Sequence, residues 1–345
     1  MRYKEEYWID VKRVIQCIPK IENLRNAKLL ITGATGMIGS SVADILFYLN
    51  KNENYDTKLY LLGREEGKVK NRFSTFALGE DYEFIEYDAT KEISFDCEVD
   101  YVIHAASNAD PVAYTECPVE TMLANLVGTN NLLRYIKEKK GRRFLYLSSS
   151  EVYGKKTDNS PYSENDYGYV DITNSRACYP SSKRAAETLC VSYGEQFDVD
   201  TVIVRPGHIY GPTILDTDSR ASAQFTRNAI NGESIIMKSA GEQMRSYCYT
   251  LDCASAILAV LINGEKGNAY NISNKDSVVS IRSLAEEIAR CANVEVVFEN
   301  PSDKEKKGYN MMSNSSLDAT KLEKLGWKAY FDLEKGVEKT VLYLK

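Results

Sequence analysis

The sequence predicts an α/β fold: helices cover both faces of a doubly wound parallel sheet, and a smaller C-terminal α/β lobe follows. Two observations predict it. Short apolar runs alternate with segments of helical periodicity up to Arg205, the pattern of parallel strands joined by crossover helices. Beyond Arg205 the segments shorten and prolines and glycines interrupt them, which indicates a second lobe.

The elements of the first domain follow from this alternation. Residues 1–27 are expected to form a helical extension packed on the main domain, because apolar residues recur there at helical spacing. The expected strands are 28–32, 58–62, 83–87, 101–104, 144–148 and 201–205, and the expected helices between them are 37–50, 118–139 and 179–197. We assign 28–205 to a Rossmann-type domain, to which 247–262 returns, and 206–345 mainly to the second lobe.

Composition excludes several classes of protein. The 345 residues have 43% apolar and 27% charged content, an ordinary globular balance. The net charge of -6 argues against a nucleic-acid partner. No segment approaches the roughly 20 apolar residues that span a bilayer, and the charged N-terminus lacks a signal sequence. We therefore expect a cytoplasmic protein with neither nucleic-acid nor membrane partners.

Cysteine and histidine usage gives no metal signal. The eight cysteines show no CxxC spacing and are expected to be reduced thiols. The two histidines, His104 and His208, have no local cluster of further ligands. No metal site is expected.

Three glycines follow the first expected strand and open the first helix, in TGATGMIGS. Gly33 permits a tight turn, Gly36 lets the backbone approach a pyrophosphate, and Gly39 lets helix and strand pack closely. The N-terminus of the helix would face the anion. The sequence therefore predicts a dinucleotide site, with a purely structural turn as the alternative. Further residues of this turn expected to line the dinucleotide are Thr35, Met37 and Ile38.

The second strand leaves the cofactor open between NAD and NADP. An acidic residue usually follows such a strand and accepts a hydrogen bond from the NAD ribose. Here the strand ends in LYLLGREEGK, and Arg64 follows Gly63. Arg64 could pair with the 2′-phosphate of NADP, Glu65 or Glu66 could reach a ribose, or Arg64 is a solvated loop charge. We expect NAD, with NADP as the alternative.

Tyr179 and Lys183 lie four residues apart, on one face of an expected helix. A neighbouring ammonium stabilises a phenolate and lowers its pKa, so Tyr179 could accept a proton from a substrate hydroxyl as hydride leaves. The segment LSSSEVYG places Ser148, Ser149 and Ser150 at a strand end, where a hydroxyl could bind the same oxygen. This pair of residues is common by chance, but the context predicts hydride transfer.

The order of these motifs resembles that of extended short-chain dehydrogenase/reductases that modify nucleotide sugars. The matching segments, from about residue 28 to the end, are the glycine turn, YVIHAAS, NLVGTNNLL, SSSEVYG, YPSSK, RPGHIYGP and LDATKLEKLGW. The resemblance implies a catalytic triad of Ser149, Tyr179 and Lys183. It also implies a role in nucleotide-sugar metabolism such as polysaccharide biosynthesis, and a homodimer formed through helices 118–139 and 179–197.

The resemblance also implies further site residues. Asp88 would contact the adenine, and an end-of-strand cap is the alternative. Asn125 would lie near the active site, and a buried structural amide is the alternative. His104 would be a packed strand-end residue rather than a catalyst. Other residues implied to contact the dinucleotide are Ala89, Ala105, Ala106 and Ser107.

Reactions of the family begin with hydride removal, usually at C4 of the sugar, and a few residues decide the outcome. The 4,6-dehydratases carry an Asp–Glu pair where this chain has Ser150 and Glu151, which disfavours dehydration. That pair, the run SRACYPSSKRAAETLC, and Tyr114 in AYTECPVETM resemble UDP-glucuronate decarboxylases. Arg245, in GEQMRSY, matches their arginine near the substrate carboxylate.

The resemblance to decarboxylases implies oxidation at C4, loss of CO2 from the resulting β-keto acid, and return of the hydride. Arg245 would stabilise charge, and Ser150 and Glu151 would position the carboxylate or act as acid and base. The alternatives are that Arg245 only binds the diphosphate and that Glu151 only orients the sugar.

Several positions depart from the decarboxylase pattern. His208 replaces an asparagine in RPGHIYGP, and Gln224 stands where an asparagine is usual, although Arg220 is kept. Lys238 replaces an aromatic residue that often lies beside the base. These departures indicate a sugar or base other than that of UDP-glucuronate. A 4-epimerase, a 4-reductase and a dinucleotide-sensing binding protein are the alternative functions.

Overall fold

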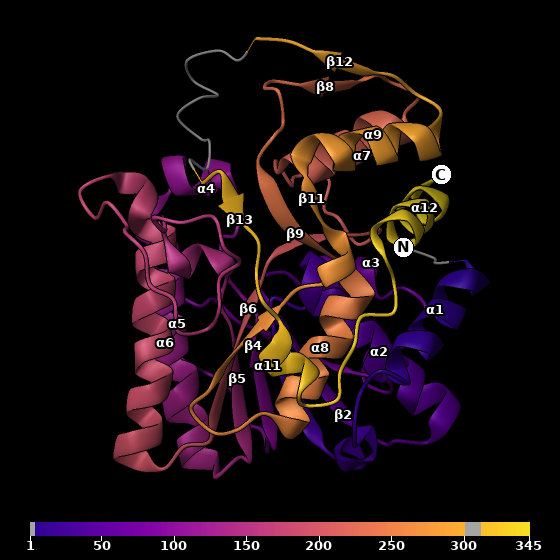
Figure 1. Cartoon of the computed structure of the whole chain (residues 1–345). Helices are drawn as coiled ribbons and strands as arrows, with labels where there is room; N and C mark the ends of the chain where they lie inside the picture. The colour runs from indigo at the N-terminus through magenta and orange to yellow at the C-terminus, as the bar shows by residue number, and fades with distance from the viewer. Residues whose placement is uncertain (1–3, 301–311) are drawn as a thin grey trace.

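A seven-stranded parallel sheet forms the centre of the first domain. The structure, a computed structural model, describes residues 4–300 and 312–345 (Figure 1). The strand order is β10-β6-β5-β4-β1-β2-β3, so the connections reverse direction beside β1. The strands are β1 (Lys28–Thr32), β2 (Lys58–Gly63), β3 (Glu83–Glu86), β4 (Tyr101–His104), β5 (Arg143–Leu147), β6 (Thr201–Pro206) and β10 (Ala269–Ile272). The predicted doubly wound parallel fold is confirmed.

Helices cover both faces of this sheet. On one face, α5 (Pro118–Lys139) packs along α6 (Cys178–Phe197), at the left of Figure 1. On the other face, α2 (Met37–Glu53) packs along α8 (Thr250–Asn263). Nearly all of α8 is buried, because this apolar helix lies between the sheet and α2. A separate hydrophobic core therefore fills each side of the sheet.

The chain returns to the first domain over a longer stretch than 247–262. β9 (Met244–Tyr249) leads into α8, and β10 then adds an edge strand parallel to β6. β10 lies beyond the segment that was expected to return. Its sequence, AYNI, is interrupted by the polar Asn271 and so lacks the apolar run that marks a strand. The domain boundaries themselves remain a prediction.

The C-terminal lobe is smaller. In it, β11 (Val278–Ser280) and β13 (Asn314–Ser315) flank β9, which also pairs with β7 (His208–Tyr210). A separate two-stranded sheet joins β8 (Ile235–Met237) to β12 (Val296–Phe298). The helices of the lobe are α7 (Ala221–Ile230), α9 (Ile281–Ala292) and α12 (Leu333–Leu344). Short elements elsewhere are η1 (Ile21–Leu24), α3 (Glu66–Arg72), α4 (Pro111–Glu116), η2 (Ser150–Tyr153), η3 (Ser175–Ala177), η4 (Lys275–Ser277) and α11 (Thr320–Glu323).

The N-terminal extension contains α1 (Glu5–Ile15), which packs on α2 and α8. Its buried face carries polar anchors as well as apolar ones. Tyr7 Oη donates to Asp44 Oδ2 at 2.7 Å, and the hydroxyl of Tyr343 in α12 donates to buried Asp10. The two ends of the described chain are thus held side by side (Figure 1).

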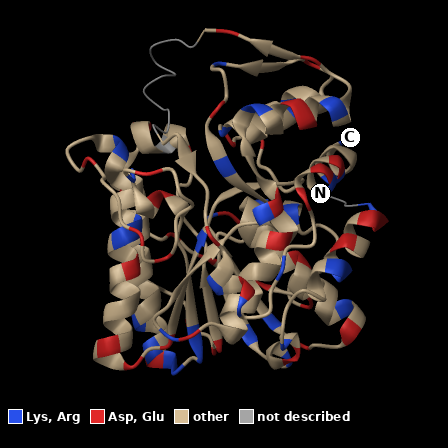
Figure 2. Ribbon diagram, in the orientation of Figure 1, with Lys and Arg blue, Asp and Glu red and all other residues tan. Residues whose placement is uncertain are grey.

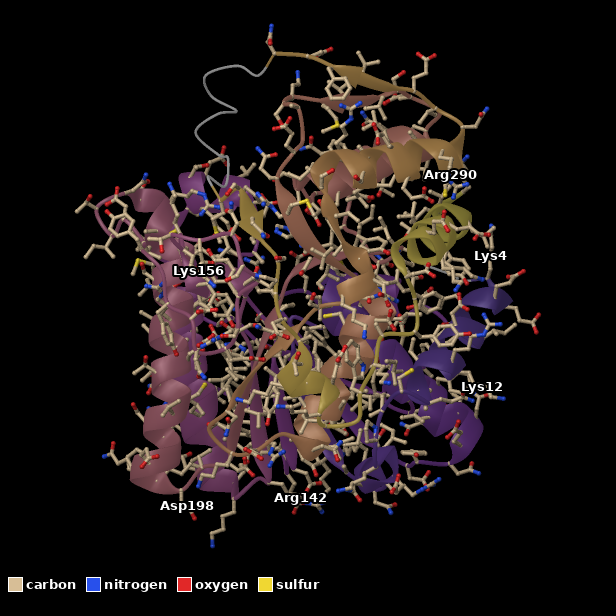
Figure 3. The ribbon with its side chains drawn as sticks, viewed as in Figure 1. Lys4, Lys12, Arg142, Lys156, Asp198 and Arg290 are labelled. Atoms are coloured by element: carbon tan, nitrogen blue, oxygen red, sulfur yellow. The ribbon has the colours of Figure 1, made fainter. Side chains whose placement is uncertain are left out.

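The strands direct their carboxyl ends toward the C-terminal lobe. Arg142 immediately precedes β5 and Asp198 closely precedes β6, and both are labelled at the lower edge of Figure 3. Ligands of open α/β sheets bind beyond the carboxyl ends of the strands. Acidic and basic positions are interspersed over both lobes in Figure 2. In the described ranges, the structure has no helix long and apolar enough to cross a membrane.

Candidate active site

The glycine turn connects β1 to α2 and leaves no room for side chains at two positions. Gly33 has φ +66°, a conformation that favours glycine, and a Cβ there would lie 2.7 Å from the carbonyl oxygen of Ala105. A Cβ on Gly39 would lie 2.4 Å from the Gly33 oxygen. Gly36 is the N-cap residue of α2, so the free amides of the helix open at this turn. Backbone and helix end form a cradle that fits a pyrophosphate.

The end of β4 is joined to the end of β1 beside this turn. Thr32 Oγ1 accepts from the backbone amides of Ala105 and Ala106 at 3.1 and 3.0 Å, and it lies 2.8 Å from Nδ1 of His104. His104 is buried, and burial lowers its pKa to about 3. A neutral, packed His104 is a scaffold for the backbone that lines the turn.

Residues predicted for the adenosine end of the cofactor lie apart from the others. Arg64 is exposed at the end of β2, and its charge contributes to lowering the pKa of Asp88. The larger cause is Thr90, whose amide and hydroxyl donate to Asp88 Oδ1 at 3.0 and 2.8 Å. Asp88 therefore caps a turn with one oxygen, and its other oxygen faces Lys91 at 3.7 Å. The next residue, Ala89, contacts the position where Gly128 of α5 would carry a Cβ.

Tyr179 and Lys183 occupy the first turns of α6, with both side chains buried. Lys183 Nζ donates to the Leu147 carbonyl at 2.7 Å, where β5 ends, and lies 5.7 Å from the centroid of the Tyr179 ring. Ser149 follows β5 and caps η2, where its Oγ accepts from the Glu151 amide at 3.2 Å. The structure thus brings the three predicted triad residues together at one strand end.

Burial dominates the titration of this pair. It raises the pKa of Tyr179 to about 12, and it lowers the pKa of Lys183 to about 7. The Glu151 charge also raises the pKa of Tyr179, whereas Ser149 and Arg220 act in the opposite direction. The sequence had suggested instead that Lys183 lowers the pKa of Tyr179. The desolvation of the buried phenol outweighs its polar neighbours.

Glu151 and Arg176 form an ion pair at two points beside this centre. Arg176 Nη1 and Nη2 donate to the two carboxylate oxygens of Glu151 at 2.9 and 3.0 Å. The guanidinium also lies 5.5 Å from the ring centroid of Tyr114, which stacks on the Tyr179 ring with a centroid distance of 4.5 Å. Arg176 was missed as a site residue, although it stands in the motif SRACYPSSK.

Two further predicted residues are buried nearby. Ser150 opens η2 and is 7% exposed. Asn125 of α5 donates to Ser182 Oγ at 3.0 Å, and its Oδ1 has no hydrogen-bond partner in the described part of the chain. One end of this amide is therefore structural, as the alternative interpretation requires, and the other end is available.

Arg245 enters from the C-terminal lobe, on β9. Its Nη1 donates to the carbonyl oxygens of Met244 and Met312 at 2.8 and 3.0 Å, and its side chain forms no ion pair within residues 4–300 and 312–345. Burial lowers the pKa of this arginine, and the charge of Glu151 partly offsets that effect. His208 lies 3.4 Å from Ser315 Oγ, and burial, with smaller contributions from Arg245 and Arg220, lowers its pKa to about 3.

The start of α7 contributes Arg220. This arginine pairs with Asp218 through Nε and Nη2, its Nη2 lies 3.7 Å from the Met37 sulfur, and its charge reaches Tyr179. It therefore lies between the glycine turn and the tyrosine. Gln224 is exposed and donates to the Ser219 carbonyl at 2.7 Å, so it does not join Arg220 beside Tyr179.

A contact between the lobes lies beside the site. Asp110, after β4, accepts from the amide and the hydroxyl of Ser219, with donor–acceptor distances of 2.8 to 2.9 Å. Asp110 also accepts from the Val112 amide at 2.9 Å and so caps α4, the helix that carries Tyr114. No sequence motif predicts the contact between Asp110 and Ser219, because the two residues are 109 positions apart in the chain.

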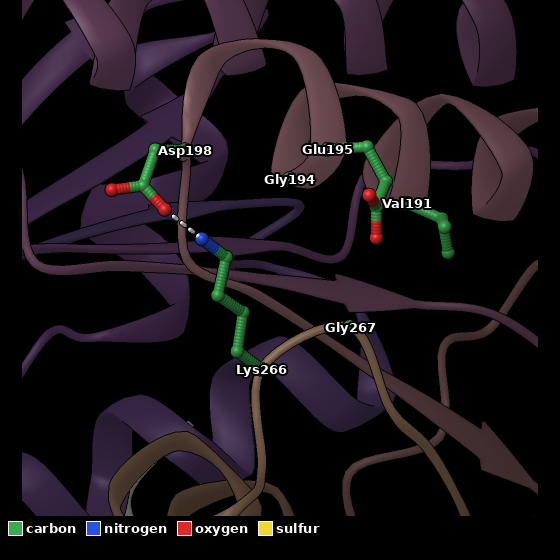
Figure 4. A pocket seen from close by; sticks show the side chains of 6 residues that line it. All are labelled: Val191, Gly194, Glu195, Asp198, Lys266 and Gly267. Atoms are coloured by element: carbon green, nitrogen blue, oxygen red, sulfur yellow. Dashed lines mark hydrogen bonds and ion pairs between the residues drawn. The ribbon is translucent and has the colours of Figure 1, made fainter.

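Two cavities lie away from this centre. One, of about 500 Å³, lies where α6 ends and is lined in part by Asp198, which forms an ion pair with Lys266 (Figure 4). The other, of about 450 Å³, is lined by residues that include Arg184, Arg205 and Glu187. Neither lining includes a predicted site residue.

The residues at the carboxyl ends of β1, β4 and β5 fit a dinucleotide. The glycine turn supplies the close approach, and α2 supplies free amides. Two buried hydroxyls, Ser107 Oγ and Ser148 Oγ, have no hydrogen-bond partner within the described ranges, so donors and acceptors remain for a ligand. The ring of Tyr179 and the amine of Lys183 would lie at the nicotinamide end.

Comparison with known proteins agrees with this geometry. Residues 29–273 match the NAD dependent epimerase/dehydratase family. The chain is 32% identical to UDP-glucuronic acid decarboxylase 5 of Arabidopsis thaliana over 90% of its length and 87% of the relative. It is 30% identical to UDP-glucuronic acid decarboxylase 1 of Xenopus tropicalis over 92% of its length and 72% of the relative.

Solved structures share the fold. UDP-N-acetylglucosamine 4-epimerase from Methanobrevibacter ruminantium, in complex with UDP-N-acetylmuramic acid, aligns with a TM-score of 0.78 at 22% identity, covering 92% of this chain and 98% of that one. A Bacillus cereus UDP-glucuronic acid 4-epimerase variant, in complex with NAD, gives 0.76 at 21% identity over 92% and 98% of the two chains. The chain therefore belongs to the NAD dependent epimerase/dehydratase family, and it is an NAD-dependent enzyme.

Proposed function

We propose that this nucleotide-sugar-modifying enzyme decarboxylates a nucleotide uronic acid after transient oxidation at C4 of the sugar. One observation carries the proposal. Arg245 is 3% exposed, and no carboxylate pairs with it in the described residues. A buried guanidinium without a counter-ion is costly, and a bound carboxylate would offset that cost.

The other two arginines grouped around Glu151 and Tyr179 are already paired. Arg176 binds Glu151, and Arg220 binds Asp218. Of the three site arginines, Arg245 alone therefore has a free charge for a substrate carboxylate. We propose that the carboxylate of a uronic acid, rather than the diphosphate that all nucleotide sugars share, compensates this charge, in keeping with the relatives named UDP-glucuronic acid decarboxylases.

The chain's own residues can begin the reaction at C4. When bound, NAD supplies the hydride acceptor at this centre and later the donor. Tyr179, in its phenolate form, takes the proton of the C4 hydroxyl, and Ser149 holds the same oxygen. Lys183, when its amine is protonated, places a positive charge beside the Tyr179 phenol. Its pKa of about 7 means that this charge is only partly present at neutral pH in the chain alone.

The resulting C4 ketone makes the C6 carboxylate a β-keto acid. The bond between C5 and C6 breaks, CO2 leaves, and its electron pair is delocalised into the C4 oxygen as an enolate. Tyr179 and Ser149 stabilise that oxygen. In this proposal Ser150 and Glu151 position the carboxylate or act as the acid for the proton that C5 then requires, and reduction at C4 completes the pentose.

Other features of the proposal are less direct. Lys238, which pairs with Glu299 at 2.7 Å, stands where an aromatic residue often lies beside the base, and this departure favours a base other than uracil. Exposed apolar residues on α5 and α6 support a homodimer through these helices, since such faces mark protein interfaces. They are Val119, Met122, Leu123, Val191 and Phe197. A cytoplasmic location and a role in polysaccharide biosynthesis belong to the same proposal.

Product analysis tests the reaction. The protein is incubated with a panel of nucleotide uronic acids and the matching hexoses, and the products are weighed by mass spectrometry. We expect a uronic acid to lose the mass of CO2 and yield a nucleotide pentose, and Arg245→Met to lose that activity. Conversion of a hexose, with every uronic acid returned unchanged or epimerised, would refute the proposal.

A further inference from the structure

The pair between Arg176 and Glu151 links three parts of the chain. Arg176 lies in η3, immediately before α6, and Glu151 lies in η2, 25 residues earlier. The side chains of both residues are 22% exposed, so the pair borders the site and is not sealed in the core. A two-point pair fixes the plane of the carboxylate as well as its charge.

Arg176 also contacts the residue that covers Tyr179. Its guanidinium lies 5.5 Å from the ring centroid of Tyr114, a distance at which a cation and an aromatic face attract each other. Tyr114 stacks on Tyr179 with an angle of 19° between the rings. One guanidinium therefore contacts both Glu151 and the ring that lies over Tyr179.

We propose that Arg176 is a positioning residue, which holds the Glu151 carboxylate and, through Tyr114, the Tyr179 phenol in the arrangement that the reaction uses. The inference rests on the proposed function for the roles of Glu151 and Tyr179. It goes beyond that function because Arg176 itself touches no reacting atom.

The charge on Glu151 affects the titration of Tyr179 and Arg245 as well as that of Arg176. It raises the pKa of Tyr179 and acts against the lowering of the Arg245 pKa. Burial alone would lower the pKa of Arg176, but the hydrogen bonds and charge of Glu151 outweigh it, so this pKa is raised. Titratable or charged groups that face Glu151 are Arg176, Tyr114, Cys178, Tyr179 and Arg245. Arg176 is the one that binds it directly, at both oxygens.

The first test measures the titration of Glu151 without substrate. Carbon-13 NMR of protein labelled at glutamate carboxyls gives this titration, and Glu151→Gln assigns the signal. Removing an opposite charge favours the protonated form of a carboxyl. We expect Arg176→Gln to move the midpoint upward, and an unchanged midpoint would overturn the proposal.

The second test asks whether Arg176 acts through Glu151. The rate of nicotinamide reduction on mixing with the glucuronates of UDP, dTDP, GDP and CDP is followed in Arg176→Gln, in Glu151→Gln and in the double variant. We expect the Arg176 substitution to slow reduction at least about tenfold in the wild-type background and to add little to Glu151→Gln. Independent, additive losses would show that Arg176 does not act through Glu151.

Two further variants distinguish a loss of positioning from a loss of the fold. Arg176→Lys keeps the charge but not the two-point contact, so we expect a nearly normal Glu151 midpoint with slowed reduction. Wild-type reduction in this variant would exclude a role for the two-point contact. The matched control is Arg143→Gln, which removes the two-point pair with Asp200 where β5 begins, at 3.0 and 2.8 Å.

We expect the control to leave the Glu151 midpoint unchanged, and an equal shift in it would mean a general effect and refute the proposal. The NMR result is separate from the reaction itself. A wild-type protein that releases no CO2 would refute the proposed function, whereas the titration of Glu151 would still decide whether Arg176 holds it.

Discussion

Replacing Lys183 with methionine should stabilise the ligand-free protein and abolish turnover. Burial lowers the pKa of Lys183 from 10.5 to about 7. Because each pK unit corresponds to about 1.4 kcal/mol, charging this amine in the fold costs about 4 kcal/mol near neutral pH. The Leu147 carbonyl loses a hydrogen bond in the variant, which costs about 1 kcal/mol. The expected gain in the free energy of unfolding is therefore about 3 kcal/mol.

The pH dependence has a definite sign. Between about pH 7 and pH 10.5, the unfolded chain binds the proton that folded Lys183 has released. The unfolding free energy of the wild type therefore rises with pH across this window, whereas the methionine variant lacks this contribution. The advantage of the variant should be largest at or below neutral pH and should shrink as the pH approaches 10.

Denaturant titrations of the cofactor-free proteins at several pH values measure this effect. Arg205→Met is the contrasting control, because Arg205 is a buried cation that has a partner, Glu187, at 2.6 Å. Its loss should cost about 3 to 5 kcal/mol by leaving a buried carboxylate unpaired. A destabilised Lys183→Met protein, or a gain that does not change with pH, would refute this interpretation of Lys183.

Three further predictions concern the cofactor, the acid/base and the assembly. Gly39→Ala should fold but bind the dinucleotide at least about tenfold more weakly, because the alanine Cβ would lie 2.4 Å from the Gly33 oxygen and push the turn open. Calorimetry with NAD measures the affinity, and an unchanged affinity would contradict the assigned pyrophosphate cradle. Tyr179→Phe should retain NAD binding and lose turnover by at least about a hundredfold, and kinetics that survive the change would exclude Tyr179 as the acid/base. Leu123→Asp, at a position 44% exposed on α5, should convert the dimer to a monomer. It should change the unfolding free energy of the subunit by less than about 1 kcal/mol. Sedimentation that shows a monomeric wild type, or a dimeric variant, would refute the proposed interface.

Features that depend on local geometry could be predicted from the sequence. The turn at Gly33 and Gly39 needs residues without side chains, so spacing alone located it between β1 and α2. Six strands of the sheet were also predictable. Five of them are short, largely buried apolar runs, whereas β3 is an edge strand that is not buried. β10 was not predictable, because Asn271 interrupts its apolar residues and leaves no run that distinguishes a strand from a loop.

Features that depend on distant residues could not be predicted. Arg176 stood in a recognised motif, but its partner Glu151 is identified only when η2 and η3 are placed together. Asp110 and Ser219 form hydrogen bonds between the two lobes, although they lie 109 residues apart in the chain. The high pKa of Tyr179 likewise reflects the total burial of its phenol, which the neighbouring Lys183 in the sequence does not reveal.

In the proposed mechanism, the hydride step at Tyr179 serves the loss of a carboxylate held by Arg245. The direct measurement is NMR of the reaction with a nucleotide uronic acid labelled with carbon-13 at the C6 carboxyl. We predict that the label appears as CO2 and bicarbonate while an unlabelled nucleotide pentose accumulates. Label that stays in the sugar while its C4 configuration changes would contradict decarboxylation and identify an epimerase.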